Sequence, residues 1–314
     1  MTKQITSSIM MIRPVAFRFN EQTAVNNYYQ QVLEGVTAEQ VQVQAQNEFD
    51  TFVEKLRVKG VEVVVVEDTL DPNTPDSIFP NNWISFHQDG RVGLYPMCAE
   101  NRRLERREDV LTILMEQHNF VINEVIDFSH YESEDLFLEG TGSMLLDREN
   151  KIVYAALSLR TESKILKDFC ERFDYKDIAF TSNQTVGTER LAIYHTNVMM
   201  CLGESFAVLC ADTVDDETER KALVESLEAT GKEVIYITEG QKHRFAGNML
   251  QVQSKTGEKF LVMSASAHQS LSPEQVKKIE KHCQILSSSL DTIEACGGGS
   301  ARCMMAEIFL PKNA

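Results

Sequence analysis

The hydrophobic residues of the chain follow a helical period in a few segments and a strand period in many more. The clearest helical pattern begins at Thr37, which forms a capping-box-like start with Gln40, and it ends at Gly60. Its apolar residues recur at intervals of three or four, at Val41, Ala45, Phe49, Phe52 and Leu56. This spacing predicts an amphipathic helix that packs one face on a core.

Four further helices are predicted, and short β-rich runs separate them. The helices begin near Glu100, Thr161, Asp216 and Ser272, the last with Pro273 at its first position. The predicted strands are 61–66, 83–86, 92–95, 121–128, 144–147, 152–156, 206–209, 234–237, 260–263 and 306–310. Helix starts recur roughly every 55 to 65 residues, which predicts about five similar α/β units. Because no low-complexity linker divides the chain, we expect one domain, 1–314.

Composition and charge restrict the classes of molecule that the protein could bind. The chain has 314 residues, of which 43% are hydrophobic and 25% charged, as in globular proteins. Its net charge of -16 would repel nucleic acids and anionic membrane surfaces. We therefore expect a small-molecule partner, with no nucleic acid and no membrane, and the sequence leaves open a homo-oligomer. Residues 1–8 lack the apolar core of a signal peptide, which favours a cytoplasmic location.

The seven cysteines are odd in number, scattered, and without C-x-x-C spacing. This pattern predicts neither a disulfide framework nor a metal site. No P-loop or dinucleotide fingerprint is present, so no cofactor is predicted.

One cysteine has an unusual context. Gly297, Gly298 and Gly299 come shortly before Cys303, and an apolar run over 304–310, which we predict to be a strand, follows it. Successive glycines contribute no packing and lose much entropy on folding, so they indicate a backbone drawn close to something. Cys303 is therefore a candidate nucleophile.

A thiol nucleophile needs a base, and histidine is the usual one. His195 lies in an apolar stretch before Gly203, where it could equally be a satisfied core residue. Glu139 lies between apolar residues and two glycines and could orient the histidine, although a surface hairpin turn would explain it as well.

A third group of residues could line a pocket. The adjacent amides Asn81 and Asn82 precede Trp83, the only tryptophan. Amides can orient a substrate by hydrogen bonds, and the indole can form a wall. The alternative is a capped turn, in which asparagine is common.

Taken in order, these motifs resemble the guanidino-group-modifying enzymes of the pentein superfamily. The set comprises 76–83, 138–140, 158–161, 195–197 and 297–303, which together span essentially the whole chain. The superfamily includes arginine deiminases, dimethylarginine dimethylaminohydrolases and amidinotransferases, and the motifs resemble most closely the branch of citrulline-utilisation hydrolases. The resemblance implies a five-bladed α/β propeller of ββαβ-type units around a central active site.

The resemblance also implies roles for individual residues. Cys303 would attack a guanidine or urea carbon, His195 would act as general acid and base, and Glu139 would hold substrate nitrogens and share the charge of the histidine. Asp76 matches a substrate-binding position. Substrate-carboxylate positions are matched by Arg160 and by either Arg102 or Arg103. No cofactor and no metal are implied.

Two departures from the superfamily pattern bear on the substrate. Asn81 and Asn82 stand where guanidine-processing relatives place carboxylates, and Thr196-Asn197 stands where they often have Leu-Asp. A buried guanidinium without a carboxylate partner is costly, so amides favour a neutral ureido group. The expected reaction is therefore hydrolysis of citrulline to ornithine, carbon dioxide and ammonia.

Several alternatives stay open from sequence. If Glu139 and Asp76 neutralise a guanidinium, the enzyme is an arginine deiminase or a dimethylarginase-like hydrolase. If an amine replaces water, it is an amidinotransferase. A non-catalytic pentein binding protein would not need the Cys303, His195 and Glu139 trio. A papain-like hydrolase fits poorly because the histidine precedes the cysteine in the chain.

Overall fold

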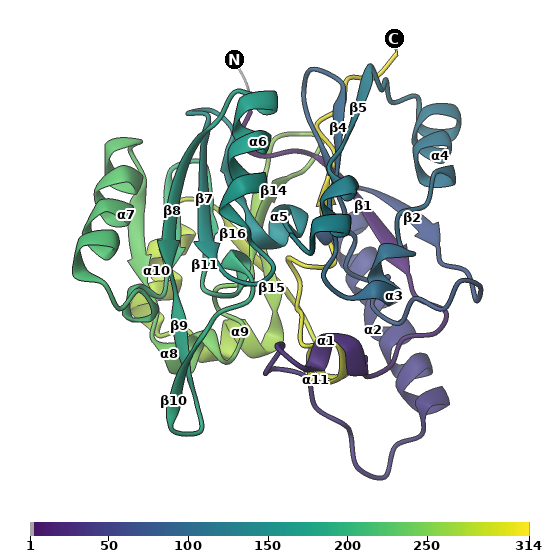
Figure 1. Ribbon diagram of the computed structural model, residues 1–314, viewed down its shortest axis with the longest axis horizontal. Coiled ribbons are helices and arrows are strands. Elements are labelled where there is room, and N and C mark those ends of the chain that lie inside the picture. Colours follow the sequence, from purple (N-terminus) through teal and green to yellow (C-terminus); the bar gives the residue numbers. More distant parts are fainter. Residues whose placement is uncertain (1–2, 314) are drawn as a thin grey trace.

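Strands and helices alternate along the chain in the computed structural model, which describes residues 3–313 (Figure 1). Within these residues the strands form five three-stranded sheets and one two-stranded sheet, and none of these sheets closes on itself. The three-stranded sheets are, in spatial order, β17 (Ala306–Glu307), β1 (Ser8–Arg13) and β2 (Glu62–Glu67); β3 (Ile84–Phe86), β4 (Arg91–Leu94) and β5 (Glu124–Asp127); β6 (Leu145–Asp147), β7 (Ile152–Leu157) and β8 (Lys176–Thr181); β11 (Met200–Leu202), β12 (Phe206–Leu209) and β13 (Glu233–Tyr236); and β14 (Leu250–Gln253), β15 (Lys259–Ser264) and β16 (Gln284–Ser288). The two-stranded sheet is a hairpin of β9 (Asn183–Val186) and β10 (Glu189–Ala192).

All five three-stranded sheets share one pairing pattern. The central strand pairs antiparallel with one neighbour and parallel with the other, as β4 does with β3 and β5. A parallel neighbour requires a crossover connection, which contains a helix in each unit. The main crossover helices are α2 (Ala38–Val58), α4 (Asp109–His118), α6 (Ser163–Phe173), α7 (Glu217–Ala229) and α10 (Pro273–Glu280).

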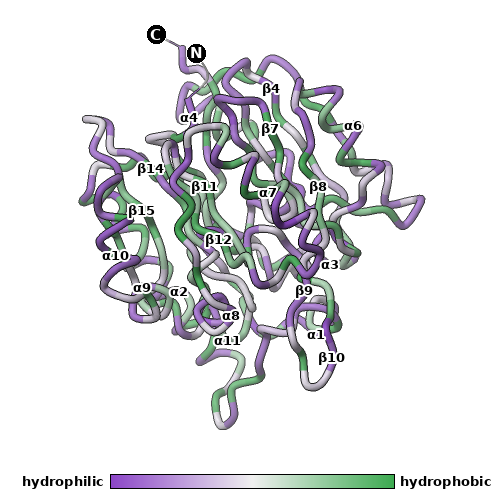
Figure 2. The backbone as a smooth tube through the Cα atoms, turned by 90° about the vertical axis from the view of Figure 1, so that its left-hand side faces the viewer, coloured by the Kyte–Doolittle hydropathy of each residue, from purple (hydrophilic) through white to green (hydrophobic). Residues whose placement is uncertain are grey.

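The crossover helices lie outside the strands. Figure 1 shows α2, α4 and α7 at the periphery, with the strands nearer the middle. Strands β11 and β12 are hydrophobic in Figure 2, and all of their residues are buried. Four clusters of buried hydrophobic side chains fill the interior between these layers. The first cluster covers both faces of β12, whose four residues are all buried.

The remaining elements are short and connect these units. They are α1 (Glu21–Ala24), α3 (Glu100–Arg103), α5 (Gly140–Ser143), α8 (Glu239–Lys242), α9 (Ala265–Ser270) and α11 (Asp291–Gly297), and the 3-10 helices η1 (Pro80–Asn82), η2 (Ser129–Glu134), η3 (Thr196–Val198) and η4 (Ala211–Thr213). Over residues 3–313, no helix is long and apolar enough to cross a membrane.

Several helix predictions are confirmed in detail. Thr37 caps α2 through a complete capping box with Gln40, and the five apolar residues of its predicted stripe are buried. A second capping box starts α10, where Ser272 is the N-cap and Pro273 follows at the first position. An N-cap of this kind stabilises a helix by about 1 kcal/mol, so residues close in sequence determine where these two helices begin.

Other predictions were wrong in extent. The helix near Glu100 ends after one turn, and α4 begins separately at Asp109. The apolar run after Cys303 is a strand only over Ala306–Glu307, and most of its other residues pack in the core outside the regular strand pairing. Strand β8 was not predicted, because most of its residues are exposed and its apolar residues, 178–180, are consecutive, so its sequence lacks the alternation of a half-buried strand.

Candidate active site

In each of the five three-stranded sheets, a polar residue comes shortly before the strand that pairs antiparallel with the central strand. Asn82 comes just before β3, Ser143 before β6, Asn197 shortly before β11, Asn248 just before β14 and Cys303 shortly before β17. Two of these residues, Asn82 and Cys303, line one small buried cavity. Its lining is Thr23, Asn27, Asp76, Phe79, Asn82, Arg102, Arg160, Tyr194, His195, Gly297, Gly298, Gly299 and Cys303.

Cys303 lies in this cavity at the end of the glycine-rich turn. Two side-chain amides donate to its Sγ, Asn248 Nδ2 at 3.2 Å and Asn197 Nδ2 at 3.4 Å. Gly298 ends α11 in the left-handed conformation, with φ of 62°. A Cβ at Gly297 or Gly299 would lie within 3 Å of the Phe79 ring. The glycines therefore allow a close approach, as expected from the sequence, and the near segment is the loop that carries Phe79.

His195 is buried and directed at Glu139. Its Nε2 lies 2.7 Å from Glu139 Oε2, and the other carboxylate oxygen, Oε1, accepts from the backbone N–H of Cys98 at 3.0 Å. Glu139 is fully buried and does not line the cavity, so it lies behind the histidine. An ionised carboxylate only accepts hydrogen bonds, so Nε2 carries the proton and Nδ1 is left as an acceptor.

The charges around this pair fix its ionisation at neutral pH. Burial acts to raise the pKa of Glu139, but the charge of Arg160, the hydrogen bond from His195 and the charge of Arg102 outweigh it and hold this pKa well below its usual range. Burial lowers the pKa of His195 to about 4, although Glu139 opposes the shift. The site therefore holds a carboxylate and a neutral imidazole at pH 7.

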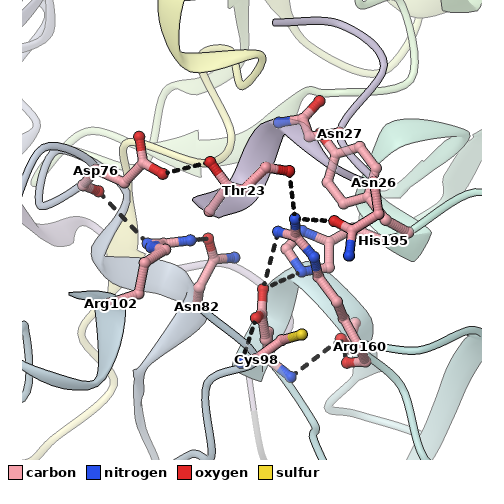
Figure 3. A network of polar contacts seen from close by, with 12 residues as sticks. Thr23, Asn26, Asn27, Asp76, Asn82, Cys98, Arg102, Arg160 and His195 are labelled. Carbon is pink, nitrogen blue, oxygen red and sulfur yellow. Dashed lines mark hydrogen bonds and ion pairs between the residues drawn. The ribbon is translucent and has the colours of Figure 1, made fainter. Parts of the chain in front are cut away.

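Two buried arginines line the cavity (Figure 3). Arg160 lies 3.4 Å from Glu139 Oε2 through Nη1, and its Nη2 donates to the Thr23 carbonyl at 3.1 Å and to the side chain of Asn26. Arg102 is held by Glu105, which accepts from Nε at 2.9 Å and from Nη2 at 2.8 Å.

Asp76 is the carboxylate on the cavity wall. Its Oδ2 accepts from Asn20 Nδ2 at 2.7 Å and from Thr23 Oγ1 at 3.0 Å, whereas Oδ1 is buried and has no partner within residues 3–313. Burial raises the pKa of this carboxyl, against the charge of Arg102 and the hydrogen bonds from Asn20 and Thr23. A buried acceptor without a partner is costly, so Oδ1 is suited to accept from a ligand.

Two amides present unused polar atoms near the cavity. Asn82 Oδ1 accepts from Arg102 Nη1 at 2.7 Å, which leaves its Nδ2 as a buried donor with no partner in the described chain. Asn197 donates through Nδ2 to Cys303, and its Oδ1 is likewise buried without a partner there. The site therefore offers both a free donor and a free acceptor.

Four of the predicted site residues do not line the cavity: Glu139 lies behind His195, Asn197 donates to Cys303 Sγ, and the other two are Arg103 and Asn81. Arg103 donates from Nε to the Met97 carbonyl at 3.0 Å and points away from the site, so Arg102 is the arginine at the cavity. Asn81 is fully buried, and neither its Nδ2 nor its Oδ1 has a partner in the described residues.

The cavity is closed in this structure. Its volume is about 20 Å³, whereas one water molecule needs about 10–15 Å³ on the same measure. Thr23 and Asn27, which follow the first strand, form part of the wall. An amino acid therefore fits only after part of this wall moves.

Sequence reasoning missed three contributors to the site. Asn248 touches Cys303, Tyr194 donates to the Gly298 carbonyl at 2.8 Å, and Thr23 bonds Asp76. The sequence contains a pattern that indicates Asn248, because Asn82 and Asn197 also precede apolar residues that begin a strand. No such pattern indicates Thr23, because it belongs to a one-turn helix that is remote in sequence from the residues it contacts.

The sequence model of the family described as N,N dimethylarginine dimethylhydrolase, eukaryotic, matches residues 13–310. The chain belongs to this family. The family is part of the pentein superfamily of guanidino-modifying enzymes, and the members of the superfamily that this chain resembles are cysteine-dependent guanidino-group hydrolases. No curated protein sequence matches the chain.

Solved structures of this superfamily share the mixed α/β fold. ArgZ, an arginine dihydrolase from the ornithine-ammonia cycle in cyanobacteria, is 18% identical with a TM-score of 0.72 over 98% of this chain. The chain spans 41% of the length of that ArgZ chain and 97% of its N-terminal domain solved with bound substrate, for which the TM-score is 0.71 over 96% of this chain. A dimethylarginine dimethylaminohydrolase adduct with S-methyl-L-thiocitrulline is 13% identical, with a TM-score of 0.62 over 98% of this chain and 100% of its own.

Proposed function

We propose that this member of the family hydrolyses the guanidino group of an arginine-type amino acid through a covalent intermediate on Cys303. The observation that carries the proposal is that Cys303, His195 and the Asp76 carboxylate line one buried cavity. Family membership and the superfamily fold support it. The five sheets with a common pairing pattern are, in this proposal, the five blades of a propeller around the site.

The chemistry uses the free nitrogen of the histidine. Nδ1 of His195 accepts the thiol proton as Sγ forms a bond to the guanidino carbon. The carbon–nitrogen bond to the leaving amine then breaks, and the imidazole returns the proton to that nitrogen. A water molecule gives a proton to Nδ1 and attacks the same carbon, and breaking the carbon–sulfur bond releases the ureido product and restores the thiol.

In this proposal, the anionic group of the cavity binds substrate nitrogens and the cationic group binds the substrate α-carboxylate. Asp76 Oδ1, a buried acceptor without a partner, is placed to accept from a substrate nitrogen. Arg160 supplies the cation for an α-carboxylate, which a guanidinium binds by paired hydrogen bonds, whereas the donors of Arg102 are taken by Glu105, Asn82 and the Phe79 carbonyl. Arg160 would exchange its contacts with Thr23 and Asn26 for the substrate when the wall opens.

A second candidate substrate, citrulline, is favoured by one observation. Arg102 fixes the Asn82 amide so that Nδ2, a donor, is the free atom. A guanidinium offers only donors, whereas a ureido group offers a carbonyl acceptor. Asn82 therefore matches a ureido group better than a guanidinium, and hydrolysis of citrulline would yield ornithine.

Parallel assays of citrulline, ornithine, ammonia and dimethylamine from arginine, N,N-dimethylarginine and citrulline test the proposal. We expect release of ammonia or dimethylamine from a guanidino substrate and a loss of at least ~10⁴-fold in kcat for Cys303→Ala. Cys283→Ala is the matched control, because Cys283 is buried outside the cavity. Turnover of citrulline alone would establish the second candidate, and turnover that requires an added amine would overturn hydrolysis.

The variant Asn82→Asp separates the two substrates. A carboxylate in place of the free Nδ2 should favour guanidinium over citrulline, so the ratio of kcat/KM for arginine to that for citrulline should rise at least tenfold. An unchanged ratio would remove Asn82 from substrate selection.

A further inference from the structure

A second cavity, of about 330 Å³, lies apart from the catalytic residues. Its lining is His87, Gln88, Asp89, Arg148, Lys151, Tyr175 and Phe309. None of these side chains takes part in the proposed reaction, so the cavity needs its own explanation.

This cavity lies at the far ends of strands whose near ends carry the catalytic site. Strand β3 begins just after Asn82 and is followed by His87. Strand β6 begins after α5, which Glu139 precedes, and is followed by Arg148. Both strands have three residues, and three residues of extended chain span about 10 Å. The two cavities therefore lie at opposite ends of the same short strands.

Arg148 is the most unusual residue of this cavity. Its side chain is only 3% exposed, yet within the described residues its guanidinium has one hydrogen-bond acceptor, the Phe86 carbonyl, at 3.4 Å from Nη1. Its nearest carboxylate, Glu307, is 3.9 Å from Nη2, which is too far for a hydrogen bond. A guanidinium has five N–H donors, so Arg148 keeps N–H groups without an acceptor among the described residues, in the wall of the cavity that it lines.

The charges around Arg148 leave the cavity positive. Lys151 lines it, with its Nζ 4.6 Å from the centre of the Tyr175 ring. The nearby acids are engaged: Asp89 pairs with Arg91 at 2.6 Å, and Glu307 pairs with Arg302 at 2.8 Å.

The buried imidazole in the wall responds to this field. The pKa of His87 is held well below its usual value, first by burial and then by the charges of Arg148, Arg91 and Lys151. His87 therefore remains neutral and bonds Ser85 Oγ at 2.9 Å through Nε2. The positive charge of the wall comes from Arg148 and Lys151, and the carboxylate nearest to Arg148, Glu307, lies 3.9 Å from its Nη2.

We propose that this cavity is a binding site for a small planar carboxylate. The Arg148 guanidinium stacks on the Phe309 ring with its Cζ 4.0 Å from the centroid, which leaves its N–H edges for a ligand. A carboxylate can accept two parallel hydrogen bonds from such an edge, and Lys151 adds a second cation. Phe309 and Tyr175 supply apolar walls, and the volume is at the lower end for ligand pockets, which run from about 300 Å³.

Calorimetric titration of the full chain with benzoate tests this site. We expect saturable binding of one equivalent, weakened at least tenfold in Arg148→Met and in Lys151→Met. Lys151 lies in the hairpin between β6 and β7, so its variant keeps the test valid if Arg148→Met folds poorly. Arg244→Met removes one positive charge at an exposed position and should bind benzoate as the unmodified chain does.

The catalytic cavity also contains arginines, so a paired variant locates the ligand. Arg160→Met should leave benzoate binding unchanged, because Arg160 lies at the other end of the strands. Loss of binding in Arg160→Met with retention in Arg148→Met would overturn the proposal. Tighter binding of inorganic phosphate than of benzoate in the unmodified chain would overturn the assignment to a planar carboxylate, as would no binding of benzoate.

Discussion

The catalytic cavity and the second cavity lie at opposite ends of β3 and β6, and each contains a buried arginine. The two arginines differ in the number of their hydrogen-bond partners. At the catalytic end, Arg102 donates to both oxygens of Glu105, to Asn82 Oδ1 and to the Phe79 carbonyl, all within 3.1 Å. At the far end, Arg148 is equally buried but has one long hydrogen bond. Arg102 is thus an internal scaffold that orients an amide, whereas Arg148 retains donors for a ligand. Burial of a charge alone does not distinguish these functions, but the number of its partners does.

The strongest test of this comparison replaces each arginine with methionine. Arg102→Met leaves Glu105 buried without its cation, and removing one partner of a buried ion pair costs about 3–5 kcal/mol. Arg148→Met loses one long hydrogen bond and keeps the apolar contact with Phe309, so we expect a change within about 1 kcal/mol. Urea unfolding measures both free energies.

A double variant provides the control for this test. In Arg102→Met with Glu105→Gln the unpaired carboxylate is gone, so part of the lost stability should return. Equal losses for Arg102→Met and Arg148→Met would contradict the distinction between the two arginines.

A second test concerns Glu294, a buried carboxyl at the catalytic end that forms no ion pair with any of residues 3–313. Glu294 accepts from Ser300 Oγ at 2.5 Å behind the glycine-rich turn, and burial raises its pKa to about 7. The protonated form is therefore favoured in the folded state. The stability that it contributes is complete below its unfolded pKa of about 4.5 and is lost as the pH rises through about 7.

Glu294→Gln should remove this pH dependence. The difference in unfolding free energy between the variant and the unmodified chain should shift in favour of the variant by about 3 kcal/mol between about pH 4 and about pH 8. Glu228→Gln, at an exposed position, is the control for loss of a carboxylate and should shift much less. Parallel pH profiles for Glu294→Gln and the unmodified chain would show that Glu294 titrates normally.

A third test, with the smallest expected effect, determines whether the catalytic cavity and the second cavity act independently. Asn248→Ala removes one of the two amides that donate to Cys303 Sγ and should lower kcat about tenfold, which corresponds to about 1.4 kcal/mol. Benzoate binding at the far cavity should not change. Asn47→Ala, on the exposed face of α2, should alter neither quantity. If Asn248→Ala also weakens benzoate binding, the two cavities are coupled.

Much of the fold was accessible from the sequence where a local signal existed. Capping boxes located the starts of α2 and α10, and the recurring helix starts indicated five similar α/β units. Strand β8 was missed because it is largely exposed and its sequence does not alternate, and the buried strands β1, β11 and β14 were missed as well. The motif resemblance also indicated the superfamily, which the family match confirms.

The candidate site was only partly accessible. Cys303, His195 and Asp76 were chosen from local context and resemblance, and the structure brings them to one cavity. The choice between Arg102 and Arg103 was not accessible, because adjacent residues of a one-turn helix point in different directions and only packing shows which one is inside. Asn248 and Thr23 join the site through contacts that are remote in sequence.

By itself, the sequence determined the kinds of groups that the protein can use: one cysteine after three glycines, a histidine and a glutamate in apolar surroundings, and amides where relatives have acids. The tertiary structure decided which atoms of those groups are free. Asn82 presents a donor because Arg102 occupies its oxygen, His195 keeps Nδ1 because Glu139 takes Nε2, and Arg148 keeps its donors because few acceptors reach it. The physical reason is that hydrogen-bond capacity is consumed by neighbours in space, and most of these neighbours lie far apart along the chain.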